Sequence, residues 1–299
     1  MGSKKNDQHI VPRTYLKHWC MPGEGSFVCV VDFGDKYNTN VQVVGVNDKM
    51  FKRKRYYNDP SFANPFIIED MLGEDFEPTY EVIMNEVKSE QELSQDVRAK
   101  IIGWLFTSKA RSPYMRDNTE RVAQFVLKTQ ERLITQSALT AEREQELESI
   151  AKETAKRVHL RQFTKEHEVK EMLTLYVETL ANKHWRILKA SPLLEFWTND
   201  NPGFSPNMEE RFHEAFGHFH PVMELNAHSI VFFPLSPKYC LEISPFEAGT
   251  PLEISALSMS IKYEEVPVAY VDYINRGVFS TKHRIVVANN KEILQRCIK

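Results

Sequence analysis

The sequence predicts an α+β fold: a central layer of about five or six helices, packed with an N-terminal hairpin and a C-terminal, mostly antiparallel sheet. Two observations predict it. Apolar residues first follow a period of about two, then one of about 3.6 in the middle of the chain, and past Pro192 they form short strand-like runs. Capping residues mark helix starts repeatedly in that middle part. We therefore expect one integrated domain over 1–299, with a turn and hairpin in 1–60, helices in 61–190 and mostly strands in 191–299.

The composition is that of a folded protein, with 42% hydrophobic and 26% charged residues. The formal net charge of −3 means that any binding of nucleic acid must come from a local basic patch. No apolar run approaches the ~20 residues that span a bilayer, and no signal-peptide core follows the polar N-terminus, so we expect no membrane partner and a cytoplasmic location. The four cysteines include no C-x-x-C pair, which argues against a thiolate zinc site.

The chain is expected to begin with extended residues 9–11 and a helix over 13–19. Pro12 fixes its own φ and disfavours helix in the residue before it. A helix over 13–19 would place Tyr15 and Trp19 on one face.

The β-branched runs 27–32 and 41–46 are typical of a hairpin. Caps and prolines then predict helix starts at Asn64 with Pro65, Pro78, Ser94, Ser112 with Pro113, Thr140 and Thr164. The last of these helices is expected to bury Trp185 and Leu188 among its apolar residues.

Past Pro192 the pattern favours a strand at 194–198 and a hairpin of 229–234 with 239–243. A helix is expected over 265–276, and a closing strand at 284–288 before a short terminal helix.

Three segments taken together carry a family resemblance. They are His9-Ile10-Val11-Pro12-Arg13 with Tyr15-Leu16, then Phe196-Trp197-Thr198-Asn199-Asp200-Asn201-Pro202, and Phe233-Pro234-Leu235-Ser236-Pro237. In this order they resemble the landmarks of the bacterial family called domain of unknown function 4238. Supporting marks are Tyr56-Tyr57, Ile68-Glu69, Glu77, and Arg111-Ser112-Pro113, where the family usually has Arg-Thr-Pro.

The resemblance extends over nearly the whole chain and implies a single integrated fold, but it implies no settled activity, substrate or cofactor. The chain departs from the family at His18 and Trp19, where the family tends to have an apolar end with Phe. The stretch 213–220, which contains three histidines, looks like a local insertion; we expect an exposed loop there, with zinc binding as the alternative.

Asp200 is the main candidate for chemistry, because Asn-Pro-Gly follows it and cannot continue a central strand. Its carboxylate either bonds the following main-chain amides or projects toward His9 and Arg13. In the second case Glu69 or Glu77 would arrive from a neighbouring helix.

Such a cluster would suit a metal-dependent phosphodiester hydrolase. The expected roles are His9 as general base or ligand, Asp200, Glu69 and Glu77 as ligands of Mg²⁺ or Mn²⁺, and Arg13 and Arg111 as stabilisers of negative charge. A structural ion pair between the acidic residues and Arg111 is the alternative reading of the same side chains. The dispersed glycines form no phosphate-binding loop, so no nucleotide cofactor is expected.

The stretch 49–57 interleaves five basic residues with three aromatic ones, which is typical of a surface for phosphates and bases. Its expected nucleic-acid-binding residues are Lys52, Arg53, Lys54, Arg55 and Tyr56. The alternative is a solvated basic loop that Phe51 and Tyr57 anchor to the core. A non-catalytic module that binds nucleic acid or protein is therefore the second functional hypothesis.

Overall fold

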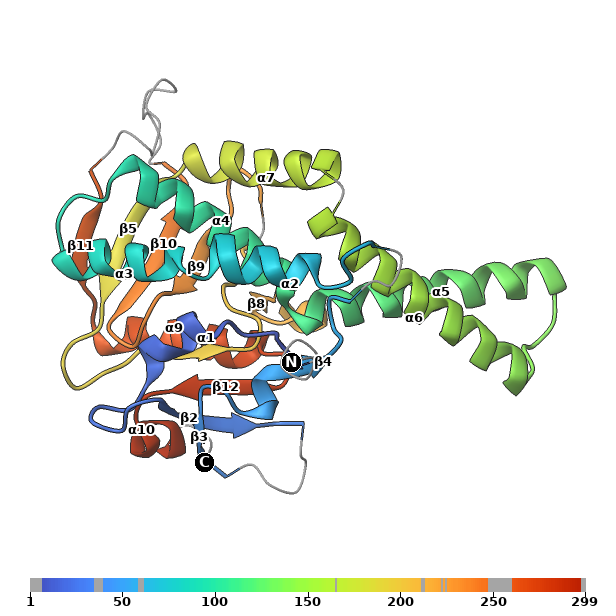
Figure 1. Cartoon of the computed structure of the whole chain (residues 1–299), viewed down its shortest axis with the longest axis horizontal. Coiled ribbons are helices and arrows are strands. Elements are labelled where there is room, and N and C mark those ends of the chain that lie inside the picture. Colours follow the sequence, from blue (N-terminus) through green and yellow to red (C-terminus); the bar gives the residue numbers. More distant parts are fainter. Residues whose placement is uncertain are drawn as a thin grey trace.

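The computed structural model describes residues 7–34, 40–58, 62–164, 166–210, 213–221, 223, 225–246 and 260–296. It is an α+β fold with two four-stranded sheets, in the orders β11-β5-β10-β9 and β3-β2-β12-β6. Helices α2, α3, α4 and α7 lie beside the first sheet, while α5 and α6 extend away from the body as a long hairpin (Figure 1). The fold class is the predicted one.

The N-terminal segment follows the sequence prediction closely. Strand β1 (Asp7–His9) precedes helix α1 (Arg13–Leu16). A 3₁₀ turn over Lys17–Trp19 follows α1 and extends it. Tyr15 and Trp19 are buried on one face, with ring centroids 4.5 Å apart.

The second sheet joins the two ends of the chain. Strands β2 (Phe27–Asp32) and β3 (Gln42–Gly45) form the predicted antiparallel hairpin. Strand β12 (Ile285–Ala288) pairs with β2, and the short β6 (Thr198–Asn199) pairs with β12. The N-terminal hairpin is thus part of one sheet with C-terminal strands.

The first sheet contains the predicted hairpin of β9 (Val231–Pro234) and β10 (Tyr239–Ser244). Strand β5 (His184–Lys189) pairs antiparallel with β10 and parallel with β11 (Lys262–Glu265). The prediction that the last long helix reaches Leu188 was wrong, because α7 ends at Ala181 and its neighbour becomes a strand. Burial of β5 between two strands overrides the helical spacing of Trp185 and Leu188.

Six α-helices occupy the middle of the described chain, within the predicted number. They are α2 (Ile67–Met71), α3 (Thr79–Ser89), α4 (Gln95–Arg111), α5 (Pro113–Thr135), α6 (Ala141–Thr164) and α7 (Glu166–Ala181), with a π turn at Leu72–Phe76. Ser94 and Ser112 cap α4 and α5 as predicted, since their hydroxyls accept the amides of Val97 and Tyr114. Helix α2 starts at Ile67, later than the predicted Pro65.

Two C-terminal predictions need correction. Residues 194–197 do not pair as a strand: the Phe196 amide donates to the Pro237 carbonyl, and the Trp197 amide donates to the Asn275 side chain. Helix α9 spans Val268–Thr281, so the predicted helix at 265–276 begins and ends too early. The remaining short elements are β4 (Lys52–Lys54), β7 (Ser205–Pro206), α8 (His213–Phe216), β8 (Phe219–His220) and α10 (Lys291–Arg296).

The three segments of the family resemblance meet at the Tyr15 hydroxyl. It donates to the Pro234 carbonyl at 2.8 Å and accepts from the Thr198 hydroxyl at 2.6 Å. Tyr80 adds a parallel link, because its hydroxyl donates to the Leu235 carbonyl at 2.6 Å. Buried hydroxyls with two partners fix the relative position of three distant segments. Within the described residues, no helix combines the length and apolar character that crossing a membrane requires.

Candidate functional site

Asp200 lies in the turn after β6 and is almost fully buried, at 1% exposure. Its carboxylate accepts the amides of His283 at 2.9 Å, Arg284 at 2.9 and 3.1 Å, and Ile285 at 3.2 Å. The carboxylate therefore does not project toward His9 and Arg13, as one sequence hypothesis had it. The amides that it binds belong to the start of β12, 83 to 85 residues further along the chain, rather than to its own turn.

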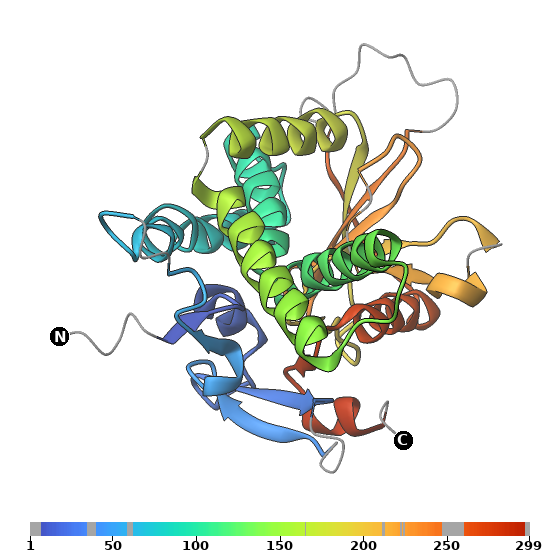
Figure 2. The same ribbon diagram turned by 90° about the vertical axis from the view of Figure 1, so that its right-hand side faces the viewer.

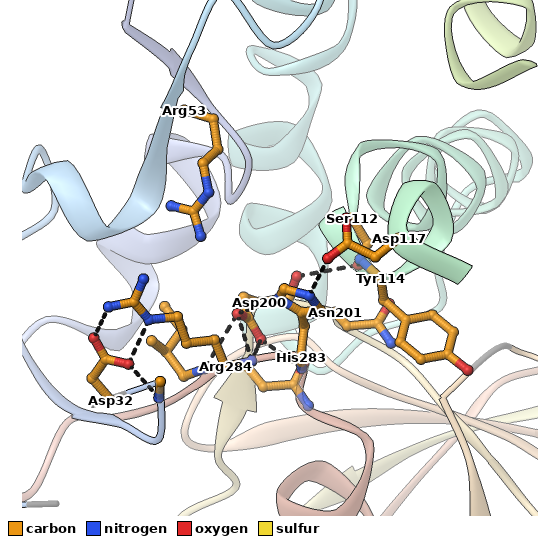
Figure 3. A network of polar contacts seen from close by, with 12 residues as sticks. Asp32, Arg53, Ser112, Tyr114, Asp117, Asp200, Asn201, His283 and Arg284 are labelled. Atoms are coloured by element: carbon orange, nitrogen blue, oxygen red, sulfur yellow. Dashed lines mark hydrogen bonds and ion pairs between the residues drawn. The ribbon is translucent and has the colours of Figure 1, made fainter. Parts of the chain in front are cut away.

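This arrangement holds the Asp200 carboxyl group in a fixed position against the 283–285 backbone (Figure 3). Burial raises the pKa of Asp200, while the amide donors and nearby His283 act in the opposite direction. By binding these amides, Asp200 fixes the position of the backbone from which the side chains of His283 and Arg284 extend.

Those two side chains reach different parts of the molecule. His283 Nε2 lies 2.7 Å from Asp117 Oδ2 on α5. Arg284 Nε donates to Asp32 Oδ1 at 2.6 Å at the end of β2. Asp200 thus connects the long helical hairpin and the N-terminal sheet at one point, as Figure 3 shows.

The ion pairs shift the titration of His283 and of Asp32. The bond to Asp117 raises the pKa of His283 above its ordinary value, although burial acts against it. Burial acts to raise the pKa of Asp32, but the Arg284 guanidinium and the Gly34 amide hold it below its ordinary value. His283 is therefore favoured as an imidazolium and Asp32 as a carboxylate.

A second cluster gathers four of the residues predicted from sequence. The buried Arg111 donates through Nη2 to the His9 carbonyl at 3.0 Å and to Glu77 Oε1 at 2.9 Å. Glu69 is close enough for its charge to act on Arg111. The structure thus shows the ion pair that the alternative reading had suggested, between Glu77 and Arg111.

The His9 imidazole lies beside this cluster in a cationic setting. Burial, together with the charges of Lys52, Arg111 and Arg13, lowers the pKa of His9 to about 4. Its Nε2 atom is buried and has no hydrogen-bond partner within the described part of the chain. The ring is consequently neutral at neutral pH.

The basic stretch 49–57 is held in place by β1. Strand β4 pairs with β1 so that Lys52 lies opposite His9 and Lys54 opposite Asp7. The buried Gln8 side chain accepts the Tyr57 amide at 2.6 Å and donates to Asn58 Oδ1 at 2.6 Å. These bonds fix the backbone that carries the lysines and arginines.

Tyr56 does not face solvent as a base-stacking residue would. It is 8% exposed and packs against Tyr57 and His159, with ring centroids 5.0 and 5.1 Å away. Phe51 and Tyr57 are fully buried, as expected of anchors to the core. The aromatic residues of the stretch therefore point inward, and its exposed residues are Lys49, Lys54 and Arg55.

A cavity of about 480 Å³ adjoins the basic stretch. Its basic lining residues are Lys49, Lys52, Arg53, Lys54 and Arg284, and its acidic ones are Asp7, Asp32 and Asp48. Because Arg284 is paired with Asp32, the four other basic residues face only two acidic ones. The cavity is therefore electropositive.

Sequence reasoning missed Asp32, Asp117, His283 and Arg284. A local signal existed at the last two, because three basic residues, Lys282 to Arg284, lie together at the start of the strand predicted over 284–288. Nothing local links them to Asp32 or Asp117, which lie more than 160 residues away.

The predicted metal ligands do not form a common site. Asp200 binds main-chain amides and Glu77 binds Arg111. In the portion of the chain that the structure describes, no group of three or more His, Cys, Asp or Glu side chains is placed to hold a metal ion. In the stretch 213–220, His213 Nε2 lies 2.7 Å from the Asn207 carbonyl.

Comparison with protein-family models matches residues 7–292 to one family, described as protein of unknown function (DUF4238). Neither the curated proteins nor the solved structures compared with the chain gave a match. The matched residues include β1, the Tyr15 junction, the Asp200 turn and β12. The chain therefore belongs to the DUF4238 family.

Proposed function

We propose that the protein binds the phosphate backbone of a nucleic acid at the electropositive cavity beside β4. The observation that carries the proposal is the lining of that cavity, where Lys49, Lys52, Arg53 and Lys54 outnumber the unpaired acidic residues. Phosphate groups bind such clusters through charge and counterion release.

The burial of Tyr56 determines the kind of recognition. Because Phe51, Tyr56 and Tyr57 all point into the core, the stretch offers charges without a stacking platform. Binding through phosphates alone is sequence-independent and strongly salt-dependent. We therefore expect similar affinity for different base sequences.

Fluorescence anisotropy with labelled single-stranded RNA and DNA tests this proposal. The double substitution Lys52→Ala and Lys54→Ala should weaken binding at least ~10-fold and reduce the magnitude of the slope of log K against log[salt] by about 1.4. Lys152 is an exposed lysine on α6, and Lys152→Ala is the matched control. This substitution should leave the affinity and the salt slope unchanged. Equal affinity of the wild type and the double variant would refute the site.

Phosphodiester hydrolysis at His9, which pairs across β1 and β4 with the cavity residue Lys52, is a second proposal. The observation in its favour is the neutral His9 imidazole, whose buried Nε2 has no hydrogen-bond partner within the described part of the chain. The second proposal keeps Mg²⁺ or Mn²⁺ as the expected ion. It names no ligands for this ion among the residues described above.

Incubation of labelled RNA and DNA with Mg²⁺ or Mn²⁺ tests this second proposal, with His9→Gln as the diagnostic variant. Loss of cleavage in His9→Gln with retained binding would support it. Cleavage at the wild-type rate in this variant would exclude His9 from the chemistry.

A further inference from the structure

Helix α5 carries an apolar stripe on the side that does not contact α6. Its members are Val122, Phe125, Val126 and Leu133, which are 56%, 71%, 43% and 73% exposed, and Thr129 lies among them. Single exposed apolar residues are ordinary, but a continuous row along one helix indicates an interaction surface.

The other side of α5 is already occupied by α6. Lys128 bonds Glu148 at 2.8 Å, and Arg143 on α6 bonds Glu131 at 2.9 Å. Figure 1 shows the two helices side by side and extending away from the body, and in Figure 2 the hairpin points toward the viewer. A partner can therefore approach the stripe without meeting the sheets.

The spacing of the stripe identifies the shape of the partner. Val122, Val126, Thr129 and Leu133 are separated by four, three and four residues, which is the a/d spacing of a helix that packs against another helix. Arg121 and Arg132 lie along the edge of the stripe nearer α6, where Arg132 is paired with Glu144 of α6, whereas Thr119, Ala123 and Gln130, which carry no charge, lie along the other edge. A facing helix of the same kind would meet no like charge on that edge.

We propose that α5 of one copy of the chain packs antiparallel against α5 of a second copy. In this register Val122 lies opposite Leu133 of the other copy, and Val126 lies opposite its Thr129, so the stripe is complementary to itself. The two hairpins together would form a four-helix arrangement around a two-fold axis.

The exposed area agrees with a dimer of moderate affinity. The stripe offers roughly 400–500 Å² of apolar surface per copy, so that two copies and their flanking polar residues approach ~1,200 Å², the lower end of stable interfaces. We therefore expect a dimer that dissociates in the micromolar range. This inference is independent of nucleic-acid binding, because the cavity beside β4 contains no α5 residue.

Sedimentation equilibrium of the full chain from about 1 to 100 μM tests the proposal. The wild type should dimerise, and Val126→Glu should raise the dissociation constant of the dimer at least ~10-fold. Ile134→Glu is the matched control, because Ile134 is 78% exposed on the same helix but lies off the stripe. Circular dichroism would verify that both variants remain folded.

A double variant tests the register. Val126→Glu with Thr129→Lys places opposite charges across the antiparallel pair and should restore dimerisation, whereas Glu at position 126 alone leaves two carboxylates at the interface. A wild type that is monomeric at 100 μM, an effect of Ile134→Glu equal to that of Val126→Glu, or a double variant that does not recover would each overturn the proposal.

Discussion

Tyr15 and Thr198 lie 183 residues apart in the sequence, and their hydroxyl oxygens are 2.6 Å apart in the core. The same Tyr15 hydroxyl donates to the Pro234 carbonyl. Tyr15→Phe removes both bonds while it keeps the ring in place. We expect the free energy of unfolding to fall by about 1–3 kcal/mol, because two buried groups lose their partner. Urea denaturation measures this, and a change below the error of the method would show that neither bond contributes to stability.

Lys109 provides a stronger test of the buried polar network around Asp200. Its Nζ lies within hydrogen-bonding distance of four oxygens and shares its N–H donors among them: the Asn201 carbonyl and side chain, the Gly203 carbonyl and the Pro221 carbonyl. Lys109→Met would leave these oxygens buried without their donor, so we expect a loss of about 3 kcal/mol or more. Lys128→Met, which breaks a more exposed ion pair with Glu148, should cost less than ~1 kcal/mol in the same urea experiment. Equal costs for the two variants would contradict the network.

The ion pair of His283 with Asp117 predicts that the stability of the protein depends on pH. The pKa of His283 is raised in the folded state by Asp117 and by Asp200, against the opposing effects of burial and Arg53. A raised folded pKa adds stability that is fully present below the unfolded value of about 6.5 and is lost as pH rises through the folded value. The stability difference between the wild type and His283→Asn should therefore be larger at pH 6 than at pH 8.5, in urea titrations at both pH values. A difference that grows with pH would refute this ion pair, and His228→Asn, in an exposed turn, is the control.

His9 should show the opposite behaviour. Its folded pKa of about 4 lies below the unfolded value, so the folded protein loses stability relative to the unfolded chain as pH falls from about 6.5 toward 4. Histidine NMR spectra recorded from pH 3.5 to 8, assigned with His9→Asn, measure this pKa directly. A midpoint near 6.5 would show that the ring is solvated and would remove the basis for a role as a neutral base.

The sequence was sufficient to predict elements whose signals are local. Ser94 and Ser112 predicted their helix starts because a hydroxyl cap acts within three residues. The sequence pattern was misleading at β5, because Trp185 and Leu188 continue the helical spacing of the preceding α7. There the pairing with β10 and β11 decides the conformation, and neither partner is near in sequence.

The candidate site, like the fold, could be predicted from the sequence only in part. The pairing of Glu77 with Arg111 was among the predicted alternatives, because an acidic residue that faces the core needs a basic partner. The partners of Asp200 were not predictable, since they are main-chain amides whose position depends on the whole sheet. A main-chain donor has no residue type by which a sequence could reveal it.

The pairing of β2 with β12 also determines when this protein is able to fold. Residues 29–32 emerge early in synthesis, yet their strand partner is 285–288. A contact between such distant segments forms late, because a long loop must close first. Until then β2 has one unpaired edge, which exposes a row of main-chain donors and acceptors to other chains. During translation the nascent protein therefore passes through a stage that is open to aggregation, and this stage ends only when strand β12 has been made.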